Sequence, residues 1–201
     1  MLTQAIALKT HSIEDYLAQE ETAEQRHEYI DGEIIPMPGG TPNHSRIILN
    51  FAGSLNHSVR KDDCQVFASD QRLWIPECCI YTYPDIFMIR EPMQLQEGRK
   101  DTIVNPILVV EVLSKSTRNY DKDGKFAAYR TIPSFVEYIL VEQDKPHVEQ
   151  YTKVPEGWLM REYSGLEATV SLDAIAFEIS LADLYNKVDF AATDETSDSS
   201  I

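Results

Sequence analysis

The sequence contains few cysteines and no long hydrophobic run. The three cysteines, Cys64, Cys78 and Cys79, are an odd number and two of them are adjacent, which suits neither a disulfide framework nor zinc-ligand spacing. No apolar run approaches the roughly 18 residues that cross a bilayer, and polar residues occur too early at the N-terminus for a signal sequence. We therefore expect a cytoplasmic protein with reduced cysteines and no membrane partner.

Basic residues are also scarce, with 18 Lys and Arg against 33 Asp and Glu and a formal net charge of −15. This balance opposes nucleic-acid binding, because contacts with phosphate supply most of the affinity of such complexes. Two local features weaken the objection. Residues 189–201 carry four acids and no base, and their Ser, Thr and Asp content predicts a disordered acidic tail. Residues 115–130 instead hold five bases and two acids.

With 201 residues, of which 43% are hydrophobic, the chain can enclose one substantial core. We expect a single domain over residues 1–188. The order of helical and strand-like segments predicts an α/β fold with a mixed central sheet flanked by helices and an additional β-hairpin. The expected helices are 13–17, 42–60, 119–130 and 181–187; the expected strands are 65–68, 71–75, 86–90, 106–113 and 135–142; the expected hairpins turn at Asp31-Gly32 and between 147–153 and 158–163.

A carboxylate lies in the middle of the most hydrophobic segment, ILVVEVLS at 107–114. So continuous an apolar run is typical of a central strand that is buried on both faces. Burial of Glu111 costs several kcal/mol unless a cation or hydrogen-bond donors replace its water. The partner is either a neighbouring Lys or Arg in a structural salt bridge, or a metal ion in a catalytic site.

A second carboxylate, Asp85, follows Pro84 at the entrance of the apolar strand 86–90. Two carboxylates at adjacent strand ends repel each other, and this arrangement is best tolerated when a divalent ion lies between them. A hard ion such as Mg²⁺, or Mn²⁺ in its place, accepts carboxylate oxygens, a main-chain carbonyl and water.

The Pro84-Asp85 pair ahead of one strand and the acid within the next resemble the PD-(D/E)xK nuclease superfamily, which includes many restriction endonucleases. In that pattern a lysine stands two residues after the second acid, on the same face of the strand, whereas this sequence has Leu113 there. The longer strings YTYPDIFMI and PILVVEVLSKSTRNYDKDGKFAAYRTIPSFVEYILV resemble the Uma-type restriction endonucleases within that superfamily. The resemblance covers roughly residues 11 to 185.

The resemblance implies a restriction-endonuclease-like core and a metal-dependent endonuclease that acts on nucleic acid, with DNA favoured. It implies that Asp85, Glu111 and the carbonyl of Val112 hold the metal, and that Lys125 on the following helix supplies the displaced ammonium. An ordinary surface pair between Lys125 and Asp121 is the alternative. His44 lies beside the site by the same resemblance, where it would orient water or phosphate unless it is structural.

Three bases near Lys125 are the expected substrate contacts: Lys115, Arg118 and Lys122 would bind the nucleic-acid backbone. Glu33, on the second arm of the first hairpin, is a weaker candidate for an acid behind the site. A homodimer is expected by analogy with nucleases that cut both strands. The rival from another class is a catalytically silent interaction protein that keeps the fold and uses its acidic surface to bind a basic partner.

Overall fold

A six-stranded sheet forms the centre of the computed structural model, which describes residues 10–114 and 117–191. Only β8 and β9 run parallel; the other neighbours pair antiparallel, so the sheet is mixed, as predicted. In spatial order the strands are β11 (Gly157–Ser164), β10 (His147–Val154), β9 (Glu137–Glu142), β8 (Pro106–Leu113), β6 (Ile86–Arg90) and β3 (Cys64–Ala68).

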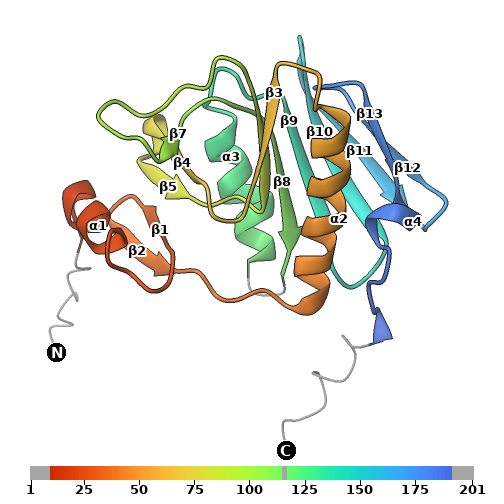
Figure 1. Ribbon diagram of the computed structural model, residues 1–201, viewed down its shortest axis with the longest axis horizontal. Helices are drawn as coiled ribbons and strands as arrows, with labels where there is room; N and C mark the ends of the chain where they lie inside the picture. The colour runs from red at the N-terminus through yellow and green to blue at the C-terminus, as the bar shows by residue number, and fades with distance from the viewer. Residues whose placement is uncertain (1–9, 115–116, 192–201) are drawn as a thin grey trace, which may run out of the picture.

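A second sheet of five short strands lies beside the first (Figure 1). The predicted strand 71–75 belongs to this sheet, together with the two arms of the first predicted hairpin. In spatial order the strands are β2 (Glu33–Pro36), β1 (His27–Ile30), β5 (Ile80–Thr82), β4 (Arg72–Ile75) and β7 (Thr102–Ile103). A separate hairpin, β12 (Thr169–Leu172) and β13 (Phe177–Ser180), follows the central sheet in the chain.

The predicted helices are present with shifted ends, and one contains an irregular turn. They are α1 (Ile13–Glu20), α2 (Pro42–Ser58), α3 (Phe126–Tyr129) and α4 (Leu181–Leu184), with a 3₁₀ turn, η1 (Pro76–Cys78), before β5. Ser12 closes a capping box on α1, and Thr41 caps α2 ahead of Pro42. The expected helix 119–130 begins as a π-helical segment, η2 (Tyr120–Lys125), which continues directly into α3. Such segments often occur at functional sites.

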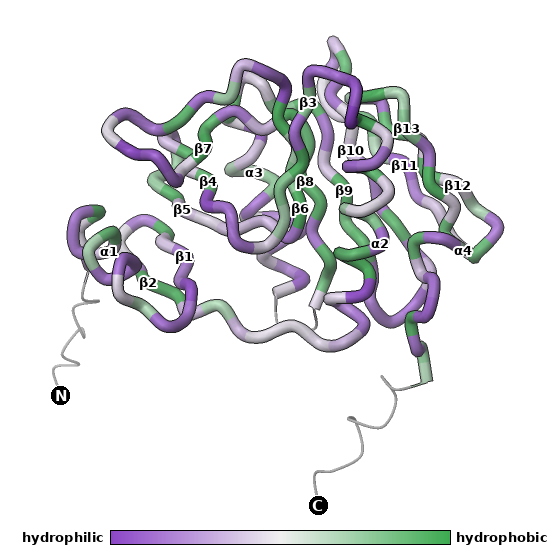
Figure 2. Tube along the Cα trace, viewed as in Figure 1, coloured by the Kyte–Doolittle hydropathy of each residue, from purple (hydrophilic) through white to green (hydrophobic). Residues whose placement is uncertain are grey.

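The two faces of β8 pack against different helices. Val110 and Val112 belong to the hydrophobic cluster that contains Phe51 of α2, whereas Val109 belongs to the cluster that contains Tyr129 of α3. Figure 1 shows α2 over one side of the central sheet and α3 between that sheet and β4 and β5, and Figure 2 shows hydrophobic residues along the central strands. Because side chains alternate along a strand, Glu111 points to the side of α3.

None of the helices within residues 10–114 and 117–191 is long and apolar enough to cross a membrane. The first residue of the predicted tail is attached to the fold, because the backbone of Asp189 exchanges two hydrogen bonds with the side chain of Asn43 in α2. The tail residues 192–201 lie outside the described residues.

Candidate active site

The structure brings Asp85 and Glu111 together at the entrance of β6. Ile86 pairs with Val110 in the antiparallel register of β6 and β8, and this register places the preceding Asp85 beside Glu111. The backbone N–H of Asp85 donates to Glu111 Oε2 at 3.3 Å, and the backbone N–H of Val112 donates to Asp85 Oδ2 at 2.7 Å. The expected convergence of two carboxylates at neighbouring strand ends is therefore present.

Lys125 reaches this carboxylate pair from η2. Its Nζ lies 3.2 Å from Glu111 Oε1, 3.1 Å from Asp121 Oδ1 and 3.4 Å from Glu28 Oε1. The Lys125 side chain is only 10% exposed. The pair with Asp121 exists, but it is buried and shared with two other acids, so it is not an ordinary surface pair. A lysine ammonium therefore lies next to Glu111, although the residue two positions after Glu111 on the strand is Leu113.

Burial and charge act in opposite directions on the central groups. The pKa of Glu111 is raised to about 8, because burial and the charge of Asp85, which raise it, outweigh the charge of Lys125, which lowers it. Burial lowers the pKa of Lys125, but the charges of Glu111 and Glu28 outweigh it, so the pKa of Lys125 is raised well above its usual value. Lys125 therefore remains an ammonium ion near neutral pH.

Tyr129 contacts the Glu111 oxygen that Asp85 does not contact. Its hydroxyl donates to Glu111 Oε1 at 2.9 Å. Burial, together with the charge of Glu111, raises the pKa of Tyr129 well above its usual value. The hydroxyl therefore stays protonated and remains a hydrogen-bond donor to the carboxylate.

His44 contacts the same Asp85 oxygen that accepts the hydrogen bond from Val112. Its Nε2 lies 3.2 Å from Asp85 Oδ2, and its backbone N–H donates to the Thr41 hydroxyl that caps α2. Burial lowers the pKa of His44, but the hydrogen bond to Asp85 and the charge of Asp85 outweigh it, so the pKa is raised. Gly40 allows this placement, because a Cβ at that position would lie 2.8 Å from His44 Nδ1.

The site contains an acid that the sequence did not reveal. Glu28 of β1 is buried, contacts Lys125 and accepts a hydrogen bond from the Thr82 hydroxyl. The first hairpin does supply an acid, but from its first arm: Glu33 on the second arm is exposed and lies opposite Ile30. Glu28 carries no local signal, because its partners come from distant segments of the chain.

The basic residues expected to bind substrate are already paired within the fold. The guanidinium of Arg118 donates to both carboxylate oxygens of Glu142, and Lys122 donates to Glu149. Lys115 lies outside the described residues. A nucleic-acid phosphate would therefore have to exchange with Glu142 and Glu149 to reach Arg118 and Lys122.

The donor atoms fit a hard divalent ion. Asp85 and Glu111 offer carboxylate oxygens and Val112 a main-chain carbonyl, the ligand types that Mg²⁺ and Mn²⁺ accept. Including Glu28 and Asp121, four carboxyl groups gather around one lysine and one histidine. When all four are ionised, their negative charge exceeds that of the two cations, and a divalent ion would offset the difference. The buried Asp121 Oδ1 has an ion pair to Lys125 but no well-aligned hydrogen bond among the described residues.

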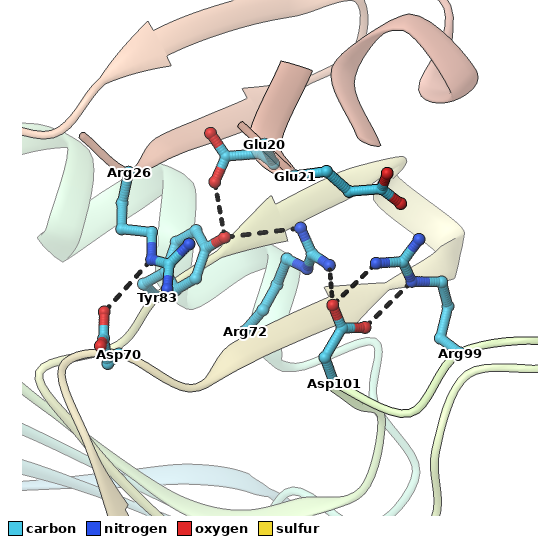
Figure 3. Close-up of a pocket in the computed structure, with 8 residues that line it drawn as sticks. All are labelled: Glu20, Glu21, Arg26, Asp70, Arg72, Tyr83, Arg99 and Asp101. Atoms are coloured by element: carbon cyan, nitrogen blue, oxygen red, sulfur yellow. Dashed lines mark hydrogen bonds and ion pairs between the residues drawn. The ribbon is translucent and has the colours of Figure 1, made fainter. Parts of the chain in front are cut away.

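A polar pocket is lined by residues of α1, of β4 and of the loops beside them (Figure 3). Its volume of about 80 Å³ is small beside the roughly 300 Å³ or more of typical ligand sites. Arg72 and Arg99 both bind Asp101 at 2.7 Å, and Arg26 binds Asp70 at 3.2 Å. Each arginine is thus already held in an ion pair within the fold, so the site around Asp85 is the better candidate for chemistry. The pocket is lined by Glu20, Glu21, Arg26, Asp70, Arg72, Tyr83, Arg99 and Asp101.

Comparison with known proteins finds a matching family model and similar proteins. The model of the Uma2 family, described as "Putative restriction endonuclease", matches residues 13–183. Two proteins of Synechocystis sp. are similar: "Uncharacterized protein sll1609" is 40% identical over 157 residues (78% of this chain, 89% of that protein), and "Uncharacterized protein slr1290" is 35% identical over 182 residues (89% and 93%).

A solved structure shares the fold. It is described as "a putative nuclease belonging to DUF820 from Anabaena variabilis", and it superposes with a TM-score of 0.66 at 20% identity, over 81% of this chain and 91% of that chain. This likeness confirms the expected α/β nuclease fold.

Proposed function

Because this chain belongs to the Uma2 family, we propose that it is a Mg²⁺-dependent endonuclease that hydrolyses phosphodiester bonds of DNA in the cytoplasm. The family and the shared nuclease fold support a nuclease-like function. The proposal of metal-dependent cleavage of DNA is based on the contact between Asp85 and Glu111 beside the buried ammonium of Lys125. Mn²⁺ would replace Mg²⁺, since it accepts the same oxygen donors.

In this proposal Asp85, Glu111 and the Val112 carbonyl hold the ion. When bound, such an ion would supply an activated water and would offset the charge of the scissile phosphate. Lys125 would donate hydrogen bonds that orient the attacking water and the phosphate. It does not act as a base, because its raised pKa keeps the ammonium protonated. His44 holds the Asp85 carboxylate in place through its 3.2 Å contact.

The substrate would approach along the basic segment that follows β8. Arg118 and Lys122 would exchange Glu142 and Glu149 for backbone phosphates, and Lys115 would add a third contact. A homodimer would place two such sites on the two strands of a duplex. Sedimentation velocity of the protein with and without duplex DNA tests this assembly, and a monomer under both conditions would contradict it.

Plasmid nicking tests the proposed reaction. We expect the wild type to nick supercoiled DNA in Mg²⁺ or Mn²⁺ and to stop in EDTA, and Asp85→Asn to lose both nicking and Mg²⁺ binding by calorimetry. Asp63→Asn is the matched control, since that carboxylate is 67% exposed and outside the site, and it should behave as the wild type. Nicking by Asp85→Asn at the rate of the wild type would refute the proposal.

The rival function is a catalytically silent protein that binds a basic partner through its acidic surface. The internal pairing of Arg118 and Lys122 favours it, because these cations are not free to meet phosphate. It predicts no binding of Mg²⁺ or Mn²⁺ to the wild type. The calorimetric titration therefore separates the two functions independently of whether the correct DNA has been found.

A further inference from the structure

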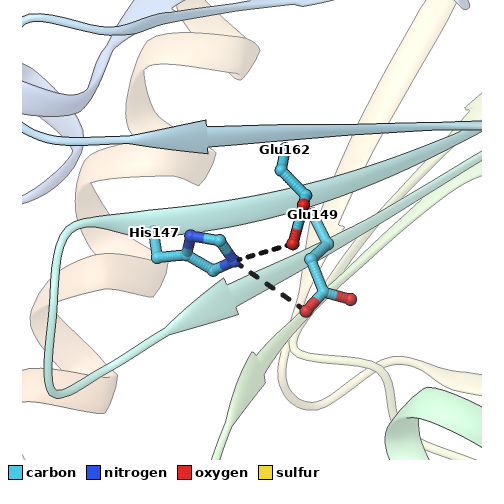
Figure 4. A group of neighbouring side chains, drawn as sticks. All are labelled: His147, Glu149 and Glu162. Carbon is cyan, nitrogen blue, oxygen red and sulfur yellow. Dashed lines mark ion pairs between the residues drawn. The ribbon is translucent and has the colours of Figure 1, made fainter.

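A histidine and two glutamates gather on the outer strands of the central sheet, away from Asp85 (Figure 4). Glu149 of β10 pairs directly with Glu162 of β11, and His147 precedes Glu149 by two residues, so the three side chains share one face. One nitrogen or oxygen from each lies within 4.8 Å of the other two. His147 Nε2 is 3.9 Å from Glu149 Oε1 and 3.7 Å from Glu162 Oε1.

Two of the three side chains are held in place before any ion binds. His147 Nδ1 lies 2.8 Å from the Ser164 hydroxyl on the facing strand, which leaves Nε2 directed at the carboxylates. Glu149 is buried, and its Oε2 accepts a hydrogen bond from the Tyr151 hydroxyl at 2.9 Å. Glu162 is 58% exposed and free to adjust. Hydrogen-bonded neighbours of this kind fix the orientation of metal ligands.

The cluster has more negative charge than its neighbours balance. Carboxylates directly opposite each other on neighbouring strands are unfavourable unless a cation lies between them. Lys122 binds Glu149, but no lysine or arginine within the described parts of the chain forms an ion pair with Glu162. A cation in front of the pair would remove this repulsion.

We propose that His147, Glu149 and Glu162 form a second metal site, which binds Zn²⁺ and is distinct from the Asp85 centre. One imidazole nitrogen and two carboxylate oxygens suit Zn²⁺, whereas Mg²⁺ prefers oxygen donors alone. Bond lengths of about 2.0–2.2 Å on a tetrahedral ion separate the ligand atoms by roughly 3.3–3.6 Å. The separations of 3.7 and 3.9 Å from His147 require only a small movement. The two carboxylate oxygens lie within 4.8 Å of each other, and the exposed Glu162 side chain can move to bring them closer.

The ion and Lys122 compete for the same oxygen. Lys122 Nζ donates to Glu149 Oε1, which is also the oxygen nearest to His147 Nε2. Binding of Zn²⁺ therefore releases Lys122 from Glu149. Removal of the Lys122 ammonium should strengthen Zn²⁺ binding, since it deletes the competitor and leaves Glu149 without its counter-charge.

Calorimetric titration of Zn²⁺ into the full chain with saturating Mg²⁺ tests the site. We expect His147→Ala to weaken binding by at least about 100-fold and Ser164→Ala by about 10-fold, because loss of a supporting hydrogen bond typically costs 10–100-fold. Lys122→Met should bind more tightly than the wild type. His57→Ala is the matched control, since this exposed histidine ends α2, far from the cluster in sequence, and its affinity should not change.

Asp85→Asn separates this site from the proposed nuclease centre. Its Zn²⁺ affinity should equal that of the wild type even if the variant neither binds Mg²⁺ nor nicks DNA. Circular dichroism confirms that each variant is folded. The proposal is overturned if folded His147→Ala binds Zn²⁺ as tightly as the wild type, or if Asp85→Asn abolishes the binding.

Discussion

The buried ammonium of Lys125 makes Lys125→Met the most informative perturbation of the fold. The substitution keeps the length of the side chain but leaves Glu28, Glu111 and Asp121, which lie 3.1–3.4 Å from Nζ, without their common cation. Loss of one partner of a buried ion pair costs about 3–5 kcal/mol. We expect a loss of this size in the free energy of unfolding, a large share of the roughly 5–15 kcal/mol of a typical domain.

The measurement is urea denaturation in EDTA near neutral pH, repeated with Mg²⁺. An ion at 100 times its dissociation constant adds about 2.7 kcal/mol to any variant that binds it only when folded. If Mg²⁺ binds beside Glu111, it should therefore recover part of the loss in Lys125→Met, because it offsets the same carboxylates.

Lys122→Met is the matched control for this experiment. Lys122 lies on the same π-helical segment, but its side chain is 29% exposed and it pairs with one acid, so we expect a loss below about 1 kcal/mol. Equal stability of Lys125→Met and Lys122→Met in EDTA would refute the reasoning, because it would mean that the carboxylates around Lys125 do not need its charge.

Three other variants test neighbouring parts of the structure. Tyr129→Phe should lower the free energy of unfolding by about 1–3 kcal/mol in urea denaturation, since Glu111 loses a buried donor; an unchanged midpoint would contradict this. In EDTA, stability should fall as pH rises from 4.5, the usual pKa of a glutamate, to about 8, because the folded state keeps a proton on Glu111 that the unfolded state releases. Glu111→Gln should flatten this part of the pH profile, and a slope equal to that of the wild type would exclude Glu111 as its source. Phe51→Ala in α2 removes a fully buried ring and should cost about 3–5 kcal/mol by the same denaturation assay, while a loss below 1 kcal/mol would contradict the packing of α2 on the sheet.

The sequence predicts the acids of the site that lie within or directly before a hydrophobic strand. It does not predict an acid that reaches the site from a distant part of the chain. Asp85 and Glu111 could be predicted because each interrupts or opens an apolar run whose burial requires a partner. Lys125 follows from helical spacing together with the family resemblance. Glu28 could not be found, since its contact with Lys125 joins two elements that are distant in the chain.

The ion pairs of the basic segment were equally invisible in the sequence. Spacing along a helix shows which residues share a face, but it does not show which strand that face meets. Arg118 pairs with Glu142 at the end of β9, and Lys122 pairs with Glu149 of β10. A local excess of base in the sequence therefore does not establish free positive charge on the surface.

The elements of the fold also differ in how well the sequence predicts them. Long segments with clear periodicity, such as β8 and α2, were predicted closely, whereas β5, β7, β12 and β13 have two to four residues and carry little periodic signal. The π-helical turn was not predicted, because the side-chain pattern of six residues does not distinguish a π-helix from an α-helix. The position of β4 within the second sheet depends in part on its pairing with β7, far along the chain, which propensity does not encode.

The centre around Lys125 is assembled from five separate stretches of chain that contribute Glu28, His44, Asp85, Glu111 and Lys125 in that order. During synthesis its last member emerges from the ribosome only after residue 125, and β9, which buries one edge of β8, emerges later still. A nascent chain or a truncated product that ends before β9 therefore cannot present the assembled centre. Synthesis must pass Glu142 before this group of residues can assemble.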